Sequence, residues 1–310
     1  MGSGGGSREG GATVAPAELD LVEQAIWRTV VYSDIYDYPL TLSELHRYLE
    51  GAALSQTALA QRLAESQRLA TQIGSDGCYF FLPGQDKQVQ VRLDRSQEAG
   101  RLLSLARSYG LWLAHLPFVR LVALTGSLAM ANVSQGADID YLIVTAPGRV
   151  WLARALVIAV VRWAAWRGAP LCPNFILSED ALHFERQNLY VAREIAQMIP
   201  LSGMAMYRRL RAENQWTERY LPNAVGPPAG AHPPAMPQWR LTRLAEWLLG
   251  GRLGDRLDEW ERGRKVRKFR RQHPNWSEAA FSRDFCKGHF DAHESEALST
   301  YDVRVSRREG

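Results

Sequence analysis

The chain has 310 residues, of which 46% are hydrophobic and 23% are charged, and its formal net charge is +4. This composition is ordinary for a soluble protein with one or two domains, and the small positive excess permits a nucleic-acid partner without requiring one. The cysteines Cys78, Cys172 and Cys286 are few, odd in number and far apart, which argues against a disulfide framework. We therefore expect a reducing compartment and a cytoplasmic protein.

The chain begins with a Gly- and Ser-rich stretch, residues 1–16, that predicts a disordered tail and not a signal peptide. Beyond it, apolar periodicity and turn residues predict helices at 17–32, 41–49 and 56–69 and a hairpin at 73–82. Thr41 and Glu44 have the spacing of a capping box, and Ser55 can cap the third helix. Three helices followed by a hairpin resemble a winged-helix domain, which we place within residues 17–94.

In DNA-binding winged helices, the third helix enters the major groove. The polar side chains available on the matching helix here are Gln56, Gln61, Arg62, Gln67 and Arg68. This set is only modestly basic. A winged helix that binds DNA and one that packs against or recognises a protein both remain open.

A helix expected at 95–113 leads into the part of the chain that contains most of the candidate site residues. The apolar run 122–124 predicts a buried strand, which is followed by Gly126 and Ser127. Gly126 allows a sharp turn and the close approach of a ligand, and Ser127 can cap a helix at 128–133. Free amides at a helix N-terminus beside a hydroxyl predict an anion site, and phosphate is the usual anion.

Two aspartates, Asp138 and Asp140, lie at the start of the next apolar run, 141–144. Side chains alternate along a strand, so we expect both carboxylates on one face, with Cα atoms about 7 Å apart. Two carboxylates at that separation can share a hard divalent cation. The alternative is a solvated strand edge, which the repulsion between two unshielded carboxylates disfavours.

Gly-Ser, ten intervening residues and Asp-x-Asp before an apolar strand together resemble the motif of the DNA polymerase beta-like nucleotidyltransferase superfamily. The resemblance implies an α+β fold with a mixed sheet and flanking helices, placed at residues 95–225. It implies that Gly126 and Ser127 hold the triphosphate of a nucleotide. It also implies that Asp138 and Asp140 bind Mg²⁺ or Mn²⁺ ions, which clamp the attacking and leaving oxygens of an in-line displacement.

The chain departs from that motif near a strand expected at 175–177. In the superfamily a third carboxylate lies on the corresponding strand, and the matching position here is Asn174. Asparagine can give a metal one neutral oxygen, but it cannot accept a proton as a carboxylate can. Glu179 and Asp180 are expected in the loop that follows, with the alternative that they curl back to the site.

The most apolar segment, 150–166, contains Arg154 and Arg162 and is shorter than the roughly 20 apolar residues of a membrane span. It predicts no membrane span but a largely buried helix against the sheet, with an interfacial membrane helix as the alternative.

Further elements are expected at 182–184 (strand), 188–199 (helix, ended by Pro200) and 203–216 (helix). Candidates for contact with a nucleotide base are Asn214, Trp216, Tyr220 and Asn223, with packing as the alternative for the aromatic residues.

A proline-rich stretch, 226–238, predicts a linker, and an amphipathic helix at 239–249 opens what we expect to be a small helical appendage, residues 239–310, with frayed last residues. Arg264–Arg271 holds six positive side chains in eight residues, which favours phosphates. The alternative is a solvated helix face balanced by the acidic residues before it.

Cys286, His289 and His293 lie at helical spacing and invite a zinc interpretation. Gly288 between them and the lack of a fourth ligand favour a buried cysteine and ordinary histidines instead.

Two functional hypotheses follow. The first is a Mg²⁺-dependent nucleotidyltransferase that moves a nucleoside monophosphate from a nucleoside triphosphate to an acceptor hydroxyl on RNA, protein or a small molecule. A toxin-antitoxin-type modifier of protein or transfer RNA is a narrower form of it. The second is a catalytically weakened nucleotide-binding or scaffold protein, whose winged helix binds DNA or a partner protein. A nucleic acid could also bind at Arg264–Arg271.

Overall fold

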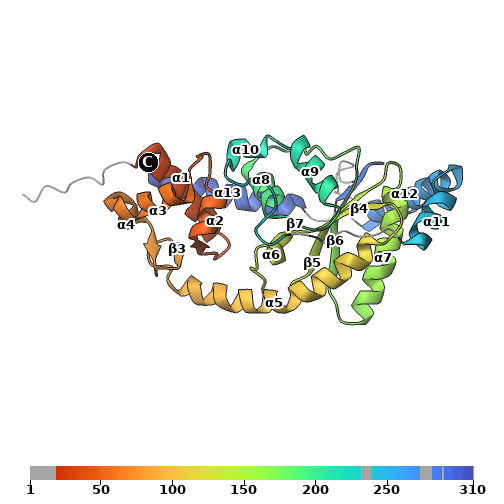
Figure 1. Ribbon diagram of the computed structural model, residues 1–310, viewed down its shortest axis with the longest axis horizontal. Helices are drawn as coiled ribbons and strands as arrows, with labels where there is room; N and C mark the ends of the chain where they lie inside the picture. Colours follow the sequence, from red (N-terminus) through yellow and green to blue (C-terminus); the bar gives the residue numbers. More distant parts are fainter. Residues whose placement is uncertain (1–18, 232, 234–238, 273–280, 288–289, 310) are drawn as a thin grey trace, which may run out of the picture.

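The computed structural model describes residues 19–231, 233, 239–272, 281–287 and 290–309. The tail expected at 1–16 lies outside these residues, as do part of the linker expected at 226–238 and His289. The described chain is an elongated α+β molecule with two sheets (Figure 1), and the larger sheet is mixed, as expected.

The N-terminal part combines short helices with a three-stranded antiparallel sheet of order β1-β3-β2. Its elements are α1 (Leu21–Asp34), β1 (Leu40–Thr41), α2 (Leu42–Arg47), α3 (Gln56–Glu65), α4 (Gln67–Gln72), β2 (Gly74–Ser75) and β3 (Tyr79–Phe81). The capping box of Thr41 and Glu44 and the Ser55 cap form as expected. The helix expected at 56–69 is instead two helices, because Ser66 takes an extended backbone that ends α3 and caps α4 with its hydroxyl.

One long helix, α5 (Lys87–Ala114), connects this part to the central sheet (Figure 1). From the sequence, this helix was expected to begin at residue 95, and a domain boundary was expected at the same place. The boundary falls inside a continuous helix, because residues 87–94 contain no glycine or proline to interrupt it. Arg92 of this segment is buried and donates to Glu44 over 2.8 Å, so α5 is also joined to the N-terminal helices.

The central sheet has the order β7-β4-β5-β6-β8. Its strands are β4 (Val119–Leu124), β5 (Ile139–Thr145), β6 (Leu171–Ser178), β7 (Ile199–Ser202) and β8 (Phe285–Lys287). β5 and β6 are parallel and are joined through α7 (Val150–Trp166), whereas the other neighbours are antiparallel. Four further helices belong to this region: α6 (Gly126–Ala129), α8 (Leu189–Gln197), α9 (Met204–Glu213) and α10 (Thr217–Tyr220).

Two local predictions around Asn214 were wrong. Residues 182–184, expected as a strand, form a loop, because the Asn214 side chain donates to the carbonyl of Leu182 and accepts from the amide of Phe184. These backbone groups are therefore satisfied by a side chain rather than by a neighbouring strand. The helix expected at 203–216 is divided at Asn214 into α9 and α10.

The structure contains a strand that the sequence analysis missed. Pro200 was expected only to end a helix, and it lies inside β7. β7 is at the edge of the sheet, where the missing N–H of a proline is tolerated.

Helix α7 has the expected bounds but is less buried than expected. Trp151 and Val157 are buried against the sheet, whereas Trp166 is 81% exposed. No helix among the described residues is long and apolar enough to cross a membrane.

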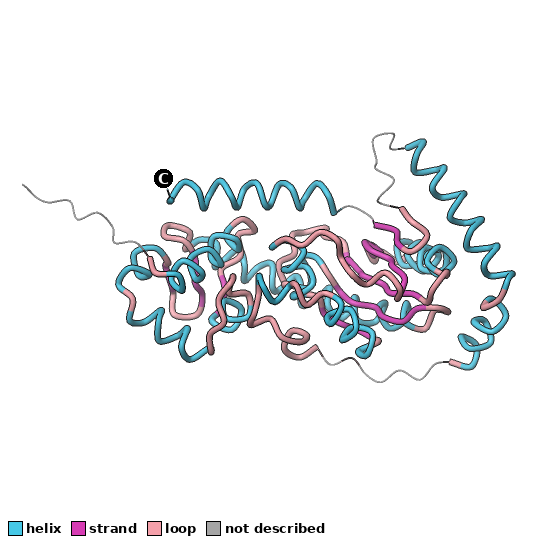
Figure 2. The backbone as a smooth tube through the Cα atoms, turned by 90° about the horizontal axis from the view of Figure 1, so that it is seen from above, coloured by secondary structure: helices cyan, strands magenta, loops and turns pink. Residues whose placement is uncertain are grey.

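The C-terminal region is integrated into the rest of the molecule and is not a separate appendage. Its helices are α11 (Arg240–Leu249), α12 (Arg252–Gln272) and α13 (Phe290–Glu309). β8 adds an edge strand beside β6, and α13 returns along the molecule to pack against α1 and α8 (Figures 1 and 2). The last residues, expected to be frayed, continue α13 through Glu309.

Helix α12 is fixed to the start of α7 by one buried carboxylate. Asp258 accepts hydrogen bonds from the amides of Trp151 (2.9 Å) and Leu152 (2.8 Å). Arg149, just before α7, donates to Asp255 over 2.7 Å. A residue from a distant segment therefore supplies the cap that α7 lacks in its own sequence.

Helix α11 forms where it was expected, but its apolar residues lie on the surface. Leu241 and Trp247 are 75% and 77% exposed, and Leu244 and Leu248 are also exposed. The expected amphipathic pattern is therefore present without a covering element in the described part of the chain.

Candidate functional site

All five residues selected from the sequence line one cavity of about 800 Å³. These residues are Gly126, Ser127, Asp138, Asp140 and Asn174. The cavity lies between the central sheet, α6, α8, the N-terminal helix α1 and the C-terminal helix α13. It therefore depends on both ends of the described chain.

Gly126 and Asp140, which both line the cavity, are in close contact. Gly126 has a φ of +65°, and a β-carbon built on it would lie 2.6 Å from Oδ2 of Asp140. The amide of Thr125 donates to the backbone carbonyl of Asp140 over 3.0 Å. The glycine of the Gly-Ser pair is thus required both by its backbone conformation and by the carboxylate beside it.

Ser127 was expected to cap a helix, but in the structure it does not. Helix α6 starts one residue earlier, at Gly126, spans only four residues and has no side-chain cap. The prediction of a helix at 128–133 was also wrong, because the chain leaves helical geometry after Ala129. Ser127 is exposed and lines the cavity, so its hydroxyl is available to a ligand. The amide of Gly126 faces the Glu194 carboxylate and acts to lower the pKa of that group.

Asp138 precedes β5 by one residue, and Asp140 lies in it, opposite Cys172 of β6. Burial and the charge of Asp140 raise the pKa of the Cys172 thiol to about 12. The thiol is therefore protonated and neutral near pH 7, so it is not a nucleophile. It donates a hydrogen bond to the carboxylate of Asp140.

Asn174 lies on β6, and its Oδ1 atom is buried without a hydrogen-bond partner. Such an atom can bind a cation or a donor group of a ligand. Glu179 and Asp180 follow β6 in a turn and are not among the residues that line the cavity, so their expected place in a loop is confirmed.

Two carboxylates and an amide oxygen are suitable ligands for a hard divalent cation. In the part of the chain that the structure describes, no group of three or more His, Cys, Asp and Glu side chains is placed to hold a metal ion. The Oδ1 atom of Asn174, which has no hydrogen-bond partner, is a further oxygen at the same cavity as Asp138 and Asp140.

Glu194 of α8 is a cavity residue that the sequence analysis missed. Burial raises its pKa to about 7, with a further increase from the charge of Asp140, while hydrogen bonds from Gln197 and Gly126 act in the opposite direction. Its Oε1 accepts from Gln197 over 2.5 Å. Glu194 is thus a carboxylate that can exchange a proton near neutral pH, beside the aspartates.

The opposite wall is aromatic and was also missed. Tyr32 comes from α1, Tyr36 and Tyr38 follow that helix, and Tyr190 and Arg193 come from α8. Burial raises the pKa of Tyr190, so this phenol stays neutral. One sequence signal could have indicated this wall: the polar side of the segment 188–199. Only the apolar side of that segment was used, to predict a helix.

The four candidates for base contact do not line the cavity. Asn214 and Trp216 are buried, and the indole of Trp216 donates to Asn214 over 3.0 Å. Tyr220 donates to the carbonyl of Gln187, and Asn223 donates to backbone carbonyls near α2. Trp216 and Tyr220 thus have contacts within the fold, in agreement with packing, the alternative given for the aromatic residues, and the two asparagines hydrogen-bond within the fold.

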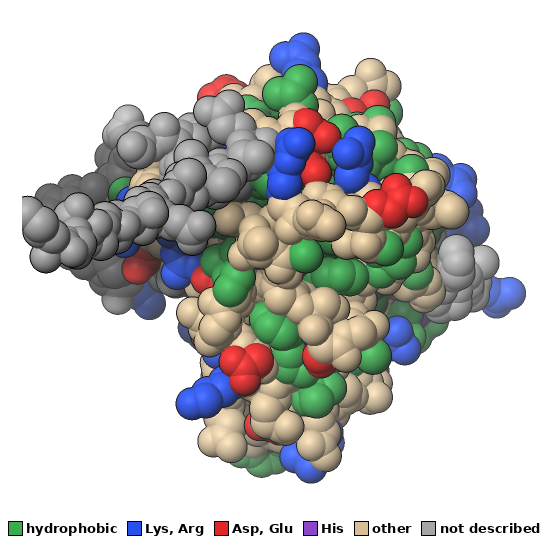
Figure 3. All heavy atoms as spheres, turned by 90° about the vertical axis from the view of Figure 1, so that its left-hand side faces the viewer, with side chains coloured by type: hydrophobic (Ala, Val, Ile, Leu, Met, Phe, Trp, Pro, Cys, Tyr) green, Lys and Arg blue, Asp and Glu red, His purple; other side chains and the backbone are tan. Residues whose placement is uncertain are grey.

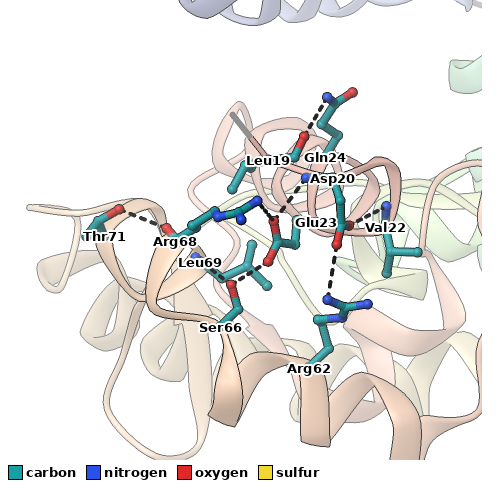
Figure 4. Close-up of polar contacts among 10 residues, drawn as sticks. All are labelled: Leu19, Asp20, Val22, Glu23, Gln24, Arg62, Ser66, Arg68, Leu69 and Thr71. Atoms are coloured by element: carbon teal, nitrogen blue, oxygen red, sulfur yellow. Dashed lines mark hydrogen bonds and ion pairs between the residues drawn. The ribbon is translucent and has the colours of Figure 1, made fainter. Parts of the chain in front are cut away.

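The basic residues of α3 and α4 face acids of α1. Figure 4 shows Arg62 paired with Asp20 (3.0 Å) and Arg68 near Glu23 (3.7 Å). At this end of the molecule, Lys and Arg side chains lie among Asp and Glu side chains (Figure 3). No continuous basic patch is visible on the described part of that face.

The basic run Arg264–Arg271 lies in α12, where Arg264 pairs with Glu261 over 2.6 Å. The preceding acids thus balance part of it. Cys286 is buried in β8, and the side chains of His289 and His293 lie outside the described residues.

Comparisons with protein-family models, with curated proteins and with solved structures found no match.

Proposed function

We propose that the protein is a Mg²⁺-dependent nucleotidyltransferase that transfers a nucleoside monophosphate from a nucleoside triphosphate to an acceptor hydroxyl. The observation that carries the proposal is the meeting of the five residues of the sequence motif in one cavity of about 800 Å³. A cavity of that size suits a small-molecule ligand such as a nucleotide.

The cavity residues have three roles in this proposal: to hold the metal, to bind a phosphate oxygen and to accept a proton. Asp138, Asp140 and the Oδ1 atom of Asn174 would hold the metal. When bound, the metal polarises the phosphoryl oxygens and lowers the pKa of the attacking hydroxyl. Ser127 donates to a phosphate oxygen. Glu194 replaces the carboxylate that is missing at position 174, and its carboxylate accepts the proton of the acceptor hydroxyl.

We further propose that the N-terminal part is a winged helix used for packing. Its helices, followed by the β2–β3 hairpin, support the winged-helix interpretation. The ion pairs of Arg62 and Arg68 and the contribution of Tyr32 and Tyr36 to the cavity support a packing role rather than DNA recognition.

The test is incubation of the pure protein with each α-³²P-labelled ribonucleoside triphosphate and Mg²⁺ or Mn²⁺, with and without cell extract. The intact protein should transfer label, and Asp138→Ala/Asp140→Ala should not. Asp180→Ala is a matched control, because this acid is outside the cavity. Equal transfer by the double variant would refute the proposal.

A nucleotide-binding protein without turnover is the second candidate, and Asn174 in place of a carboxylate favours it. It predicts metal-dependent nucleotide binding that is lost in the double variant. Neither the intact protein nor any of the variants should transfer label.

A further inference from the structure

Arg193 is a buried cation at the cavity wall whose charge is only partly compensated. Its side chain is 4% exposed and lines the cavity, and its Nε and Nη2 atoms have no hydrogen-bond partner. Among the described residues, the structure gives it no ion pair. A buried guanidinium is normally paired with a carboxylate, because removing it from water is costly.

Two aromatic rings hold Arg193 in place. Its guanidinium carbon lies 4.7 Å from the ring centre of Tyr32 and 4.9 Å from that of Tyr48. Contacts with ring faces offset part of the lost hydration and fix the plane of the guanidinium. They leave its in-plane N–H groups, which bind carboxylate and phosphate, for another partner.

The acidic groups nearby do not provide that partner. Glu194, the next residue, accepts a hydrogen bond from Gln197. Glu50 accepts from Tyr301, and Asp34 accepts from Arg304. Arg304 also lines the cavity, as does the exposed Glu296 of α13. The wall formed by α1, α8 and α13 thus carries two arginines and two glutamates, whereas Asp138 and Asp140 lie on the sheet side.

We propose that Arg193 forms an anion subsite of the cavity and binds a phosphate or carboxylate group of a substrate. The guanidinium pairs with that anion, whereas the charge of Arg304 is already paired with Asp34. Binding of an anion follows from the buried cation alone, whereas its assignment to a substrate rests on the proposed function. The anion belongs either to the acceptor or to the nucleotide itself.

The first experiment measures binding of inorganic phosphate by calorimetry in metal-free buffer with EDTA. The wild type should bind phosphate, and Arg193→Met should bind it about ten- to a hundredfold more weakly, which corresponds to one charged hydrogen-bonded pair. Arg193→Lys keeps the charge without the planar fork and should lie between them. Arg211→Met removes a comparable arginine outside the cavity and should bind like the wild type.

Equal binding by the wild type and Arg193→Met, or no binding by the wild type, would overturn the proposal. Circular dichroism and thermal unfolding establish that each variant is folded. If Arg193→Met does not fold, the comparison of wild type with Arg193→Lys decides, and equal affinities would overturn the subsite.

A second pair of measurements separates this proposal from the proposed function. Asp138→Ala/Asp140→Ala should keep metal-free phosphate binding even if the protein transfers no nucleotide. With Mg²⁺ present, nucleotide binding by Arg193→Met that equals the wild type assigns the anion to the acceptor. A loss parallel to that of phosphate assigns it to the nucleotide.

Discussion

The carboxylate of Asp140 occupies the space where a side chain on residue 126 would begin. A β-carbon there would lie 2.6 Å from Oδ2 of Asp140, closer than such atoms approach in proteins. The glycine of the Gly-Ser pair and the second aspartate of the Asp-x-Asp pair, fourteen positions apart, are therefore one structural unit.

Gly126→Ala should disturb this unit in two ways. The positive φ costs about 1 kcal/mol, and displacement of Asp140 should weaken metal-dependent nucleotide binding by at least about tenfold. Gly136→Ala is the matched control, because Gly136 also has a positive φ but nothing lies within 4 Å of its β-carbon position. Urea unfolding and calorimetry give the two quantities, and equal nucleotide affinities for the two variants would contradict the prediction.

Glu194 should make stability depend on pH in a defined window. Its pKa is about 7 in the folded protein and near 4.5 when unfolded, so between these values the folded state binds more protons. Its contribution to stability therefore falls as pH rises from about 4.5 to 7. Glu194→Gln cannot titrate, so it should gain in stability relative to the wild type across that range.

The measurement is urea unfolding of wild type and Glu194→Gln at a series of pH values in EDTA. Glu185→Gln, an exposed carboxylate that precedes α8, is the control. A difference between wild type and Glu194→Gln that does not change with pH would show that Glu194 ionises normally.

Asp258→Ala should destabilise the protein by about 1–3 kcal/mol, because it leaves one buried and one partly buried amide at the start of α7 without an acceptor. Asp255→Ala removes a neighbouring acid from the same helix, but the Asp255 side chain is 58% exposed. Its loss should cost less than about 1 kcal/mol. Thermal unfolding of both variants checks this order. A larger effect of Asp255→Ala than of Asp258→Ala would contradict the conclusion that Asp258 fixes α12 to the start of α7.

Trp247→Gln in α11 should change stability by no more than about 0.5 kcal/mol, because this indole is exposed. Trp151→Ala, in the core, should cost about 3–5 kcal/mol. Denaturant unfolding of the two variants provides the comparison. A large loss in Trp247→Gln would mean that α11 is covered in solution.

The site motif could be predicted from the sequence because its parts are local. Gly126, Ser127, Asp138 and Asp140 lie within fifteen residues, and the two apolar runs beside them identify strands that pair. The caps at Thr41 and Ser55 were predictable for the same reason. The mixed α+β class was expected from the family resemblance that this local motif carries.

The rest of the cavity could not be predicted, because packing of distant segments creates it. Arg193 and Glu194 look like ordinary polar positions of an amphipathic helix until α8 is placed between β5 and α1. Nothing in the sequence of β8 or α13 indicates that they return to the sheet and to α1. The position of Pro200 in β7 and the side-chain contacts of Asn214 likewise depend on neighbours far away in the chain.

The return of α13 to α1 also has a consequence for biosynthesis. Tyr301 packs edge-on against Tyr32, with ring centres 5.6 Å apart, and Arg304 bonds to Asp34. A chain emerging from the ribosome presents Asp138 and Asp140 long before α13 exists to close the cavity. The acidic side of the site is therefore synthesised early, and the cavity wall that completes it forms only when translation has passed residue 304.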